Sequence, residues 1–268
     1  MKLKYILLIV CAIVAYGLSY TKGSEVPINI PITAHRGASI SYPENTMSAF
    51  VEAYNLGADY IELDVQETKD EYIVISHNNN LKKTSGIDKK ITESKYDELK
   101  NIDVGSHKDE RFSDERIPLL EDVIKFAKEK NMKLNIEIKR EGRGKNYEQN
   151  ILDIINKYDY KDMCEISSFD LKIINNIKEI DKTIKCAYII NYDFEDDVNI
   201  DNVDAFSIEV KNINKALVDK IHDANKKVYA WVANKKEEID EMISLSVDNI
   251  ITDDVAFVKE VLKEYNHK

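Results

Sequence analysis

The sequence is poor in the residues that mark disulfide-stapled or zinc-bound proteins. Only three cysteines, Cys11, Cys164 and Cys186, occur among 268 residues, and none has a neighbour at the spacing of a zinc site. Cys164 and Cys186 fall near the starts of two neighbouring predicted strands, where buried thiols are common. We therefore expect two buried free thiols there rather than a disulfide.

Basic residues are outnumbered by acidic ones. The chain carries 38 Lys and Arg against 49 Asp and Glu, which gives a formal net charge of -11. Because a nucleic-acid surface needs clustered Lys and Arg to neutralise phosphates, we expect no nucleic-acid partner. A small anionic substrate stays compatible with this balance, since the local charge of a cleft can oppose the overall sign.

An apolar run at the N-terminus is short for a membrane span. It covers residues 5–18 and follows Lys2 and Lys4, a pattern typical of a secretory signal. The cleavage signal is imperfect, so an uncleaved anchor stays open. We predict residues 1–24 as a signal peptide or N-terminal membrane anchor, and residues 25–268 as one catalytic domain. The protein is then expected outside the cytoplasm, secreted or attached to the membrane through this segment.

After residue 30, short strand-like segments alternate with segments of helical periodicity. Helices are predicted over residues 43–55, 118–130, 147–158, 171–180, 215–225, 235–245 and 255–265. Strands are predicted to begin at Ile30, Tyr60, Lys133, Met163, Lys185, Ala205, Lys227 and Asn249. This α/β alternation implies parallel crossover units, and eight of them predict a closed (β/α)8 TIM barrel. An open doubly wound sheet is the alternative, but no glycine-rich phosphate motif follows the first strand.

Two local expectations accompany this topology. In the helix over 43–55, the apolar residues Met47, Phe50, Val51 and Tyr54 recur on the face that we expect to be buried. Between residues 78 and 117 the periodicity loosens, with a short helix predicted over 93–100 and a charged loop over 105–116. Because long loops in compact domains tend to be functional, we expect a loop and short-helix excursion over the active-site mouth.

Acidic side chains occupy strand positions that apolar residues normally fill. Alternation along the second strand puts Glu62 and Asp64 on one face, and alternation along the next puts Glu137 and Lys139 on one face. Buried carboxylates are costly unless positive charge meets them. Three oxygen donors on neighbouring strands suit a hard cation, so we predict one divalent cation, calcium or magnesium, bound by Glu62, Asp64 and Glu137. A self-satisfied ion-pair network is the alternative.

Two of the five histidines belong with this set. His35 ends the first predicted strand and precedes Arg36, and His77 ends an extended segment over 72–76 that returns to the same mouth. A histidine suits proton transfer near neutral pH, and an Arg can hold a phosphate oxygen. Together with Lys139 and a bound cation, these residues form a set suited to phosphodiester cleavage. The other histidines are interpreted as surface or structural residues: His107, His222 and His267.

The motifs that carry these residues extend over nearly the whole chain after the N-terminal segment. They are His35-Arg36-Gly37 with 43–46, Glu62-Leu63-Asp64-Val65, Ile75-Ser76-His77, Glu137-Ile138-Lys139, Ser168-Phe169, Trp231 and the segment 248–253. In this order they resemble the glycerophosphodiester phosphodiesterase family of metal-dependent barrels. The resemblance implies hydrolysis of small-molecule glycerophosphodiesters to glycerol 3-phosphate and an alcohol.

The resemblance also implies roles for individual residues. His35 and His77 would be the catalytic acid and base, and the three carboxylates would be the metal ligands. The substrate-binding residues would be Arg36 and Lys139 at the phosphate, with Phe169 and Trp231 beside the glycerol. Packed barrel aromatics are the alternative for the last two.

The sequence departs from the family pattern at two positions near His77. Asn78 replaces a usual Asp, which leaves the pH optimum open, and Lys83 replaces a usual Arg. Two other substrate classes stay open: lysophospholipids, as for a lysophospholipase D, and glycerophosphate wall polymers, for which the pairs at 82–83 and 89–90 could form a basic rim. A non-catalytic binding barrel would have lost a histidine or ligand, and none is lost.

Overall fold

The computed structural model describes residues 28–140 and 144–267. The predicted signal peptide or anchor over residues 1–24 lies outside this part of the chain. Among the described helices, none is both long and apolar enough to cross a membrane.

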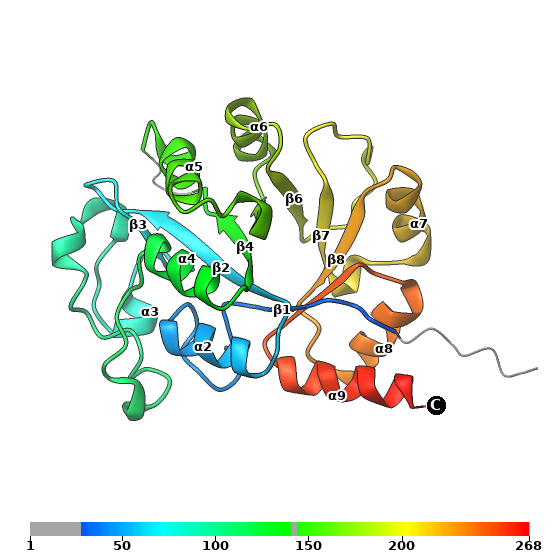
Figure 1. The fold of residues 1–268 in the computed structure, drawn as a ribbon, viewed down its shortest axis with the longest axis horizontal. Coiled ribbons are helices and arrows are strands. Elements are labelled where there is room, and N and C mark those ends of the chain that lie inside the picture. The colour runs from blue at the N-terminus through cyan, green and yellow to red at the C-terminus, as the bar shows by residue number, and fades with distance from the viewer. Residues whose placement is uncertain (1–27, 141–143, 268) are drawn as a thin grey trace, which may run out of the picture.

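Nine strands form one sheet in the described residues (Figure 1). They are β1 (Ile32–Ala34), β2 (Tyr60–Glu67), β3 (Ile73–Ile75), β4 (Lys133–Ile138), β5 (Cys164–Ser168), β6 (Lys185–Ile190), β7 (Ala205–Glu209), β8 (Lys227–Trp231) and β9 (Asn249–Thr252). The order is β1-β9-β8-β7-β6-β5-β4-β2-β3, and β1 also pairs with β2. That pairing closes eight parallel strands into a barrel, while β3 joins β2 outside it in antiparallel fashion. The predicted TIM barrel is confirmed.

Helices cover the barrel because the longer ones present an apolar stripe to the outer faces of the strands. They are α2 (Met47–Asn55), α3 (Lys82–Ser85), α4 (Leu120–Glu129), α5 (Tyr147–Lys157), α6 (Leu171–Ile180), α7 (Lys215–Asp223), α8 (Lys236–Leu245) and α9 (Val255–Asn266). Side chains cap several of their first turns: Thr46 accepts from Ala49 N, and Asp170 accepts from Lys172 N. Such caps satisfy backbone donors that the first helical turn leaves free.

Helix α2 starts later than predicted and buries a different face. It begins at Met47, after the Thr46 cap, rather than at Pro43. Its buried face consists of Ala49, Phe50 and Ala53, whereas Val51 and Tyr54 are each 40% exposed. The small alanines let the helix approach the sheet closely, so the larger side chains point outward. The expectation that Val51 and Tyr54 are buried is wrong.

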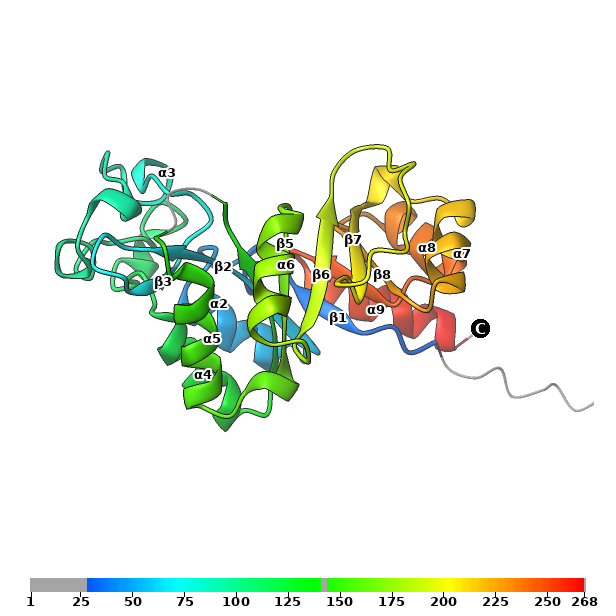
Figure 2. The same cartoon turned by 90° about the horizontal axis from the view of Figure 1, so that it is seen from above.

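Residues between β2 and α4 form the expected excursion, which gathers at one side of the barrel (Figure 2). It has its own apolar core, which includes Val74, Leu81, Ile91 and Leu99. The predicted helix over 93–100 is wrong: the 3-10 turns Ile91–Glu93 and Tyr96–Glu98 stand there. The other short 3-10 segments are Glu110–Phe112, Lys161–Met163 and Val210–Asn212. Because the excursion contains β3, it delivers His77 to the barrel mouth.

The two described cysteines lie at or near the starts of β5 and β6. Cys164 and Cys186 are buried and free. Burial raises the pKa of each thiol to about 12, so both stay protonated at neutral pH. They act as small apolar side chains, as the sequence predicts.

Candidate active site

Three carboxylates meet inside the barrel mouth. In the register of β2 and β4, Asp64 lies directly beside Glu137, and Glu62 lies one step below Asp64 on the same face. One oxygen from each of the three residues lies within 4.8 Å of the others. All three side chains are buried. The strand alternation that predicts this cluster is confirmed.

The carboxylates differ in how far neighbouring cations compensate their burial. Lys139 Nζ forms an ion pair with Asp64 Oδ1 at 2.7 Å and a second, shorter contact with Glu137. Burial alone would raise the pKa of Asp64, but Lys139 and Arg36 hold it well below its usual value. Burial, with the charge of Asp64, raises the pKa of Glu62 and of Glu137. The cluster therefore carries more acidic groups than its cations neutralise.

This imbalance is the basis for testing whether a cation fits. Glu62 Oε1 is buried and accepts no hydrogen bond from the described residues. An orphaned buried oxygen beside two further carboxylates is the donor set that a hard divalent cation requires. Glu62, Asp64 and Glu137 would hold the ion, and this geometry agrees with the predicted metal-binding triad.

The turn after β1 is built to face this cluster. Arg36 has φ 57° and donates its backbone N–H to Glu62 Oε2 at 2.8 Å. Its guanidinium lies 3.4 Å from Asp64 Oδ2 and 3.3 Å from Glu44 Oε1. Glu44 in turn pairs with Lys83 at 3.2 Å. A continuous line of alternating charges thus runs from the excursion to the carboxylates.

Gly37 makes this turn possible. Its φ is 83°, and a Cβ added there would lie 2.7 Å from the carbonyl carbon and the Cβ of Ala49. Only glycine combines the left-handed conformation with such a close approach to α2. The adjoining Arg36 is thereby held against the acidic cluster.

His35 is positioned by the last strand of the barrel. Its Nδ1 lies 2.7 Å from Asp253 Oδ1, and its backbone N–H donates to Thr252 O. Asp253 also accepts from Ser39 Oγ at 2.8 Å and from Asn234 Nδ2 at 2.6 Å. These interactions outweigh burial and hold the pKa of Asp253 well below its usual value. A charged carboxylate therefore holds the Nδ1 edge of the His35 ring and leaves Nε2 free for proton transfer.

His77 has a weaker partner. Its Nδ1 lies 3.1 Å from Asn78 Oδ1, and Gln66 Nε2 donates to its carbonyl oxygen at 3.3 Å. Burial lowers the pKa of His77 by more than the charge of Asp64 raises it. The neutral imidazole is therefore favoured near pH 7. Asn78, which replaces a usual acid, orients the ring without adding charge.

The predicted site residues converge on one cavity of about 180 Å³. Eight of the nine line it: His35, Arg36, Glu62, His77, Glu137, Lys139, Phe169 and Trp231. The ninth, Asp64, lies fully buried beneath Lys139. Phe169 and Trp231 meet edge to face with ring centroids 5.7 Å apart, and Trp231 Nε1 donates to Ser207 O. The two rings thus form one continuous aromatic part of the cavity lining.

Two residues of the site received no chemical role from the sequence. Asp253 was recognised only as part of a terminal motif, although it holds His35. Asn45, which the sequence shows only as part of the motif over 43–46, bonds to Asp64 through both ends of its amide. An acid directly after β9, next to the histidine after β1, would have been a usable signal once barrel closure was assumed.

Comparison with known proteins agrees with this geometry. A sequence model of the glycerophosphoryl diester phosphodiesterase family matches residues 35–257, and the chain therefore belongs to this family. A glycerophosphodiester phosphodiesterase of Caldanaerobacter subterraneus is 33% identical over 230 residues, which cover 83% of this chain and 93% of the relative. The predicted family and its reaction class, phosphoric diester hydrolysis, are confirmed.

Two further similarities are to a human protein and to a solved structure. A human lysophospholipase D is 26% identical over 87% of this chain and 86% of its own. A phosphodiesterase of Oleispira antarctica, solved with its product sn-glycerol-3-phosphate, has a TM-score of 0.83 at 24% identity, covering 87% of this chain and 96% of that one. This last similarity supports the barrel fold.

Proposed function

We propose that this protein hydrolyses glycerophosphodiesters to glycerol 3-phosphate and an alcohol, using His35 and His77 as the acid–base pair. The observation that carries the proposal is the single cavity in which both histidines, Arg36 and Lys139 face a buried carboxylate triad. In the reaction, a water oxygen replaces the alcohol oxygen on phosphorus. One histidine takes a proton from the water, and the other gives a proton to the departing alkoxide.

The cations of the site would hold the phosphate. Arg36 can direct guanidinium N–H groups at the phosphate oxygens, and Lys139 adds a point charge on the opposite side of the carboxylates. Both therefore stabilise the charge that develops on phosphorus oxygens. A divalent cation, calcium or magnesium, held by Glu62, Asp64 and Glu137 would add Lewis-acid stabilisation when bound.

Lysophospholipids are the second candidate substrate. The similarity to a human lysophospholipase D favours this class, since that relative covers most of the chain. An exposed aromatic wall at Phe169, 42% exposed, would also tolerate an acyl group nearby. The reacting phosphodiester and the histidine pair would be the same for both substrate classes.

The experiment measures release of glycerol 3-phosphate by purified full-length protein. Glycerophosphocholine, glycerophosphoethanolamine, glycerophosphoglycerol and lysophosphatidylcholine are compared, first with chelator and then with calcium or magnesium. We expect release only with added metal. Glycerol 3-phosphate formed equally with chelator would contradict the metal dependence, and choline or lysophosphatidic acid from lysophosphatidylcholine alone would favour the second candidate.

We also propose that residues 1–24 direct the protein out of the cytoplasm, with membrane attachment if the segment is retained. The basic residues before the apolar run support this proposal. N-terminal sequencing of protein from fractionated cells tests it. Intact Met1 on cytoplasmic protein would contradict export.

A further inference from the structure

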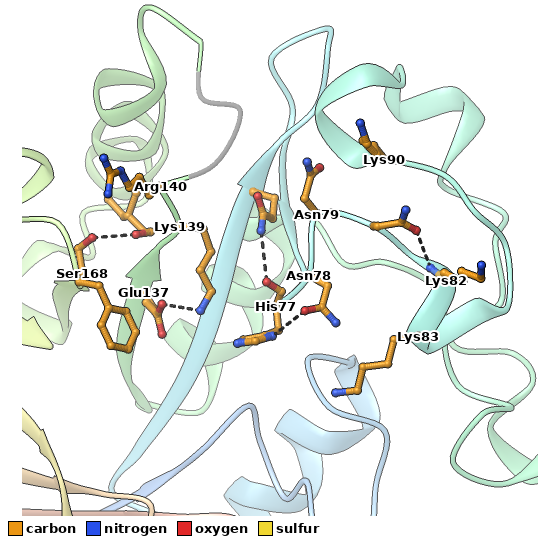
Figure 3. Close-up of a pocket in the computed structure, with 14 residues that line it drawn as sticks. His77, Asn78, Asn79, Lys82, Lys83, Lys90, Glu137, Lys139, Arg140 and Ser168 are labelled. Carbon is orange, nitrogen blue, oxygen red and sulfur yellow. Dashed lines mark hydrogen bonds and ion pairs between the residues drawn. The ribbon is translucent and has the colours of Figure 1, made fainter. Parts of the chain in front are cut away.

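A second, larger cavity adjoins the reacting centre. This groove has a volume of about 810 Å³, more than four times that of the 180 Å³ cavity. It runs between the excursion and the ends of β4 and β5 (Figure 3). The two cavities share four lining residues: His77, Glu137, Lys139 and Phe169.

If the protein has the proposed function, the shared wall indicates where the two halves of a diester substrate bind. Phosphorus must lie beside His77 and Lys139, where the cavities meet. Beyond this shared wall, the smaller cavity is lined by His35, Arg36 and Glu62 of the reacting centre and by uncharged residues that include Trp231, Ser207 and Ile251. An uncharged three-carbon glycerol matches the uncharged part of this lining in size and charge. The leaving alcohol then enters the 810 Å³ groove.

The lining of the groove is cationic. Lys82, Lys83, Lys90 and Arg140 join Lys139 along it, and the only acid in the described lining is Glu137 at the junction. Figure 3 shows Arg140 on one side, with Lys83 and Lys90 on the other. This concentration stands in a chain of net charge -11.

Acidic neighbours of these cations lie outside the lining. Lys83 pairs with Glu44, Lys90 with Glu93 at 2.7 Å, and Arg140 with Asp170 at 3.5 Å. No ion pair of Lys82 is seen among the described residues. The cations of these three pairs have side chains that are more than half exposed. Exposed ion pairs are weak, so these pairs neutralise the groove only in part.

One residue that lines the groove also has a buried polar acceptor without a partner among the described residues. Gln66 is 2% exposed and lines the groove, and its Oε1 accepts no hydrogen bond from the described residues. Its Nε2 is committed to the carbonyl of His77, which fixes the orientation of the amide. A buried unpaired acceptor is costly unless a ligand donates to it, and a hydroxyl group would do so.

We propose that the preferred leaving alcohol is a phosphorylated polyol. Its hydroxyl groups would bond to the amides of the groove, and its additional phosphate would bind Lys82, Lys90 and Arg140. A glycerol phosphate unit joined to the reacting phosphodiester, as in a short glycerol phosphate chain, meets this description. Choline and ethanolamine do not, because their cationic head groups would be repelled by the same side chains.

The test compares three substrates that differ in the charge of the leaving group. They are glycerophosphoglycerol, the same diester with a phosphate on the distal glycerol, and glycerophosphocholine. We expect kcat/KM of full-length protein to be highest for the phosphorylated diester, by roughly tenfold at low salt, and to fall most steeply with ionic strength for this substrate. Equal values for the three substrates would overturn the proposal while leaving the proposed phosphodiesterase intact. No glycerol 3-phosphate from any of them would instead contradict the proposed function.

A matched pair of double variants separates the groove from overall charge. Lys82→Gln with Lys90→Gln removes two groove cations, and Lys69→Gln with Lys89→Gln removes two that do not line the groove. Lys89 belongs to the basic segment 89–90 suggested by the sequence, but it forms an ion pair with Glu98 and does not line the groove.

We expect the groove variant to lose roughly five- to tenfold in kcat/KM for the phosphorylated diester relative to glycerophosphoglycerol. The control variant should change this ratio by less than twofold. The same change in both variants would show that net charge, not the groove, selects the substrate, and would overturn the proposal.

Discussion

Asn45 and Asp64 clamp each other through two hydrogen bonds. Asn45 Nδ2 donates to Asp64 Oδ2 at 2.7 Å, and Asp64 N donates to Asn45 Oδ1 at 3.2 Å. Asn45 has φ 61°, a conformation that asparagine tolerates better than most residues. The clamp leaves Asp64 Oδ1 facing Lys139, so it sets which oxygen is available to the cluster.

Removing the clamp should weaken cation binding. Asn45→Ala takes away both hydrogen bonds, and we expect roughly tenfold weaker divalent affinity, because partners of ligand carboxylates orient them. Calorimetric titration measures this change. Asn45→Gly is the control for backbone strain: it should lose the same affinity but less stability than Asn45→Ala, since glycine accepts a positive φ. Unchanged affinity in both variants would contradict the orienting role.

Both histidines should be needed for turnover. We expect His35→Ala and His77→Ala each to lower kcat by about 10² to 10⁴, the usual contribution of a positioned acid or base. Circular dichroism and thermal unfolding check that each variant stays folded. Near-normal turnover in either folded variant would exclude that histidine from proton transfer.

The role of Asn78 should appear in the pH profile. Burial lowers the pKa of His77, and an acceptor of full negative charge on its Nδ1 would stabilise the imidazolium. Asn78→Asp should therefore raise the pKa of His77 and move the corresponding limb of kcat/KM to higher pH. Asn79→Asp is the control, because Asn79 lines the groove without touching the ring. Identical profiles for wild type and Asn78→Asp would contradict this electrostatic account.

The charge of Asp253 should make the stability of the folded protein depend on pH in the acidic range. Its pKa is depressed in the folded protein, so its charged form contributes stability above pH of about 4, and this contribution is lost as pH falls. Urea unfolding at pH 5 and pH 3 should show a larger loss for wild type than for Asp253→Asn. At pH 7 the same variant should lose at least tenfold in kcat, since His35 loses its orienting partner.

Ser39→Ala is the matched control for Asp253. It removes the Ser39 hydrogen bonds to the Asp253 carboxylate and to the carbonyl oxygen of His35, and leaves the contact between Asp253 and the His35 ring. A smaller loss in kcat is expected. Equal losses in the two variants would mean that the Ser39 hydroxyl, not the charge on Asp253, positions the ring.

The sequence predicts the barrel well because alternation and helical periodicity report burial directly. Every barrel strand falls within two residues of its predicted start, and the carboxylate positions follow from period two. The failures lie where apolar periodicity is absent or misleading. Helix α3, Lys82–Ser85, buries no residue, so no apolar periodicity in the sequence predicts it. In α2, alanines rather than Val51 and Tyr54 face the sheet.

The site was predictable only where its contacts are local. Glu62 and Asp64 belong to one strand, whereas Asp253 and His35 are 218 residues apart and meet because β9 pairs with β1. The residues around Asp253 indicate that contact only once the barrel is assumed to close through β1 and β9. The groove likewise needs the excursion to fold back beside β2, which brings Lys90 of the excursion and Arg140 after β4 to one cavity.

The most direct test of the account is titration of calcium and magnesium onto wild-type protein, Glu62→Gln and Glu165→Gln by calorimetry. Glu165 is a buried glutamate on β5 that bonds to Tyr229 and stands outside the triad, so it controls for loss of any buried acid. We predict one divalent cation per wild-type chain, at least tenfold weaker binding in Glu62→Gln, and wild-type affinity in Glu165→Gln. Equal binding by all three proteins would contradict the claim that the triad beneath the histidines holds the metal.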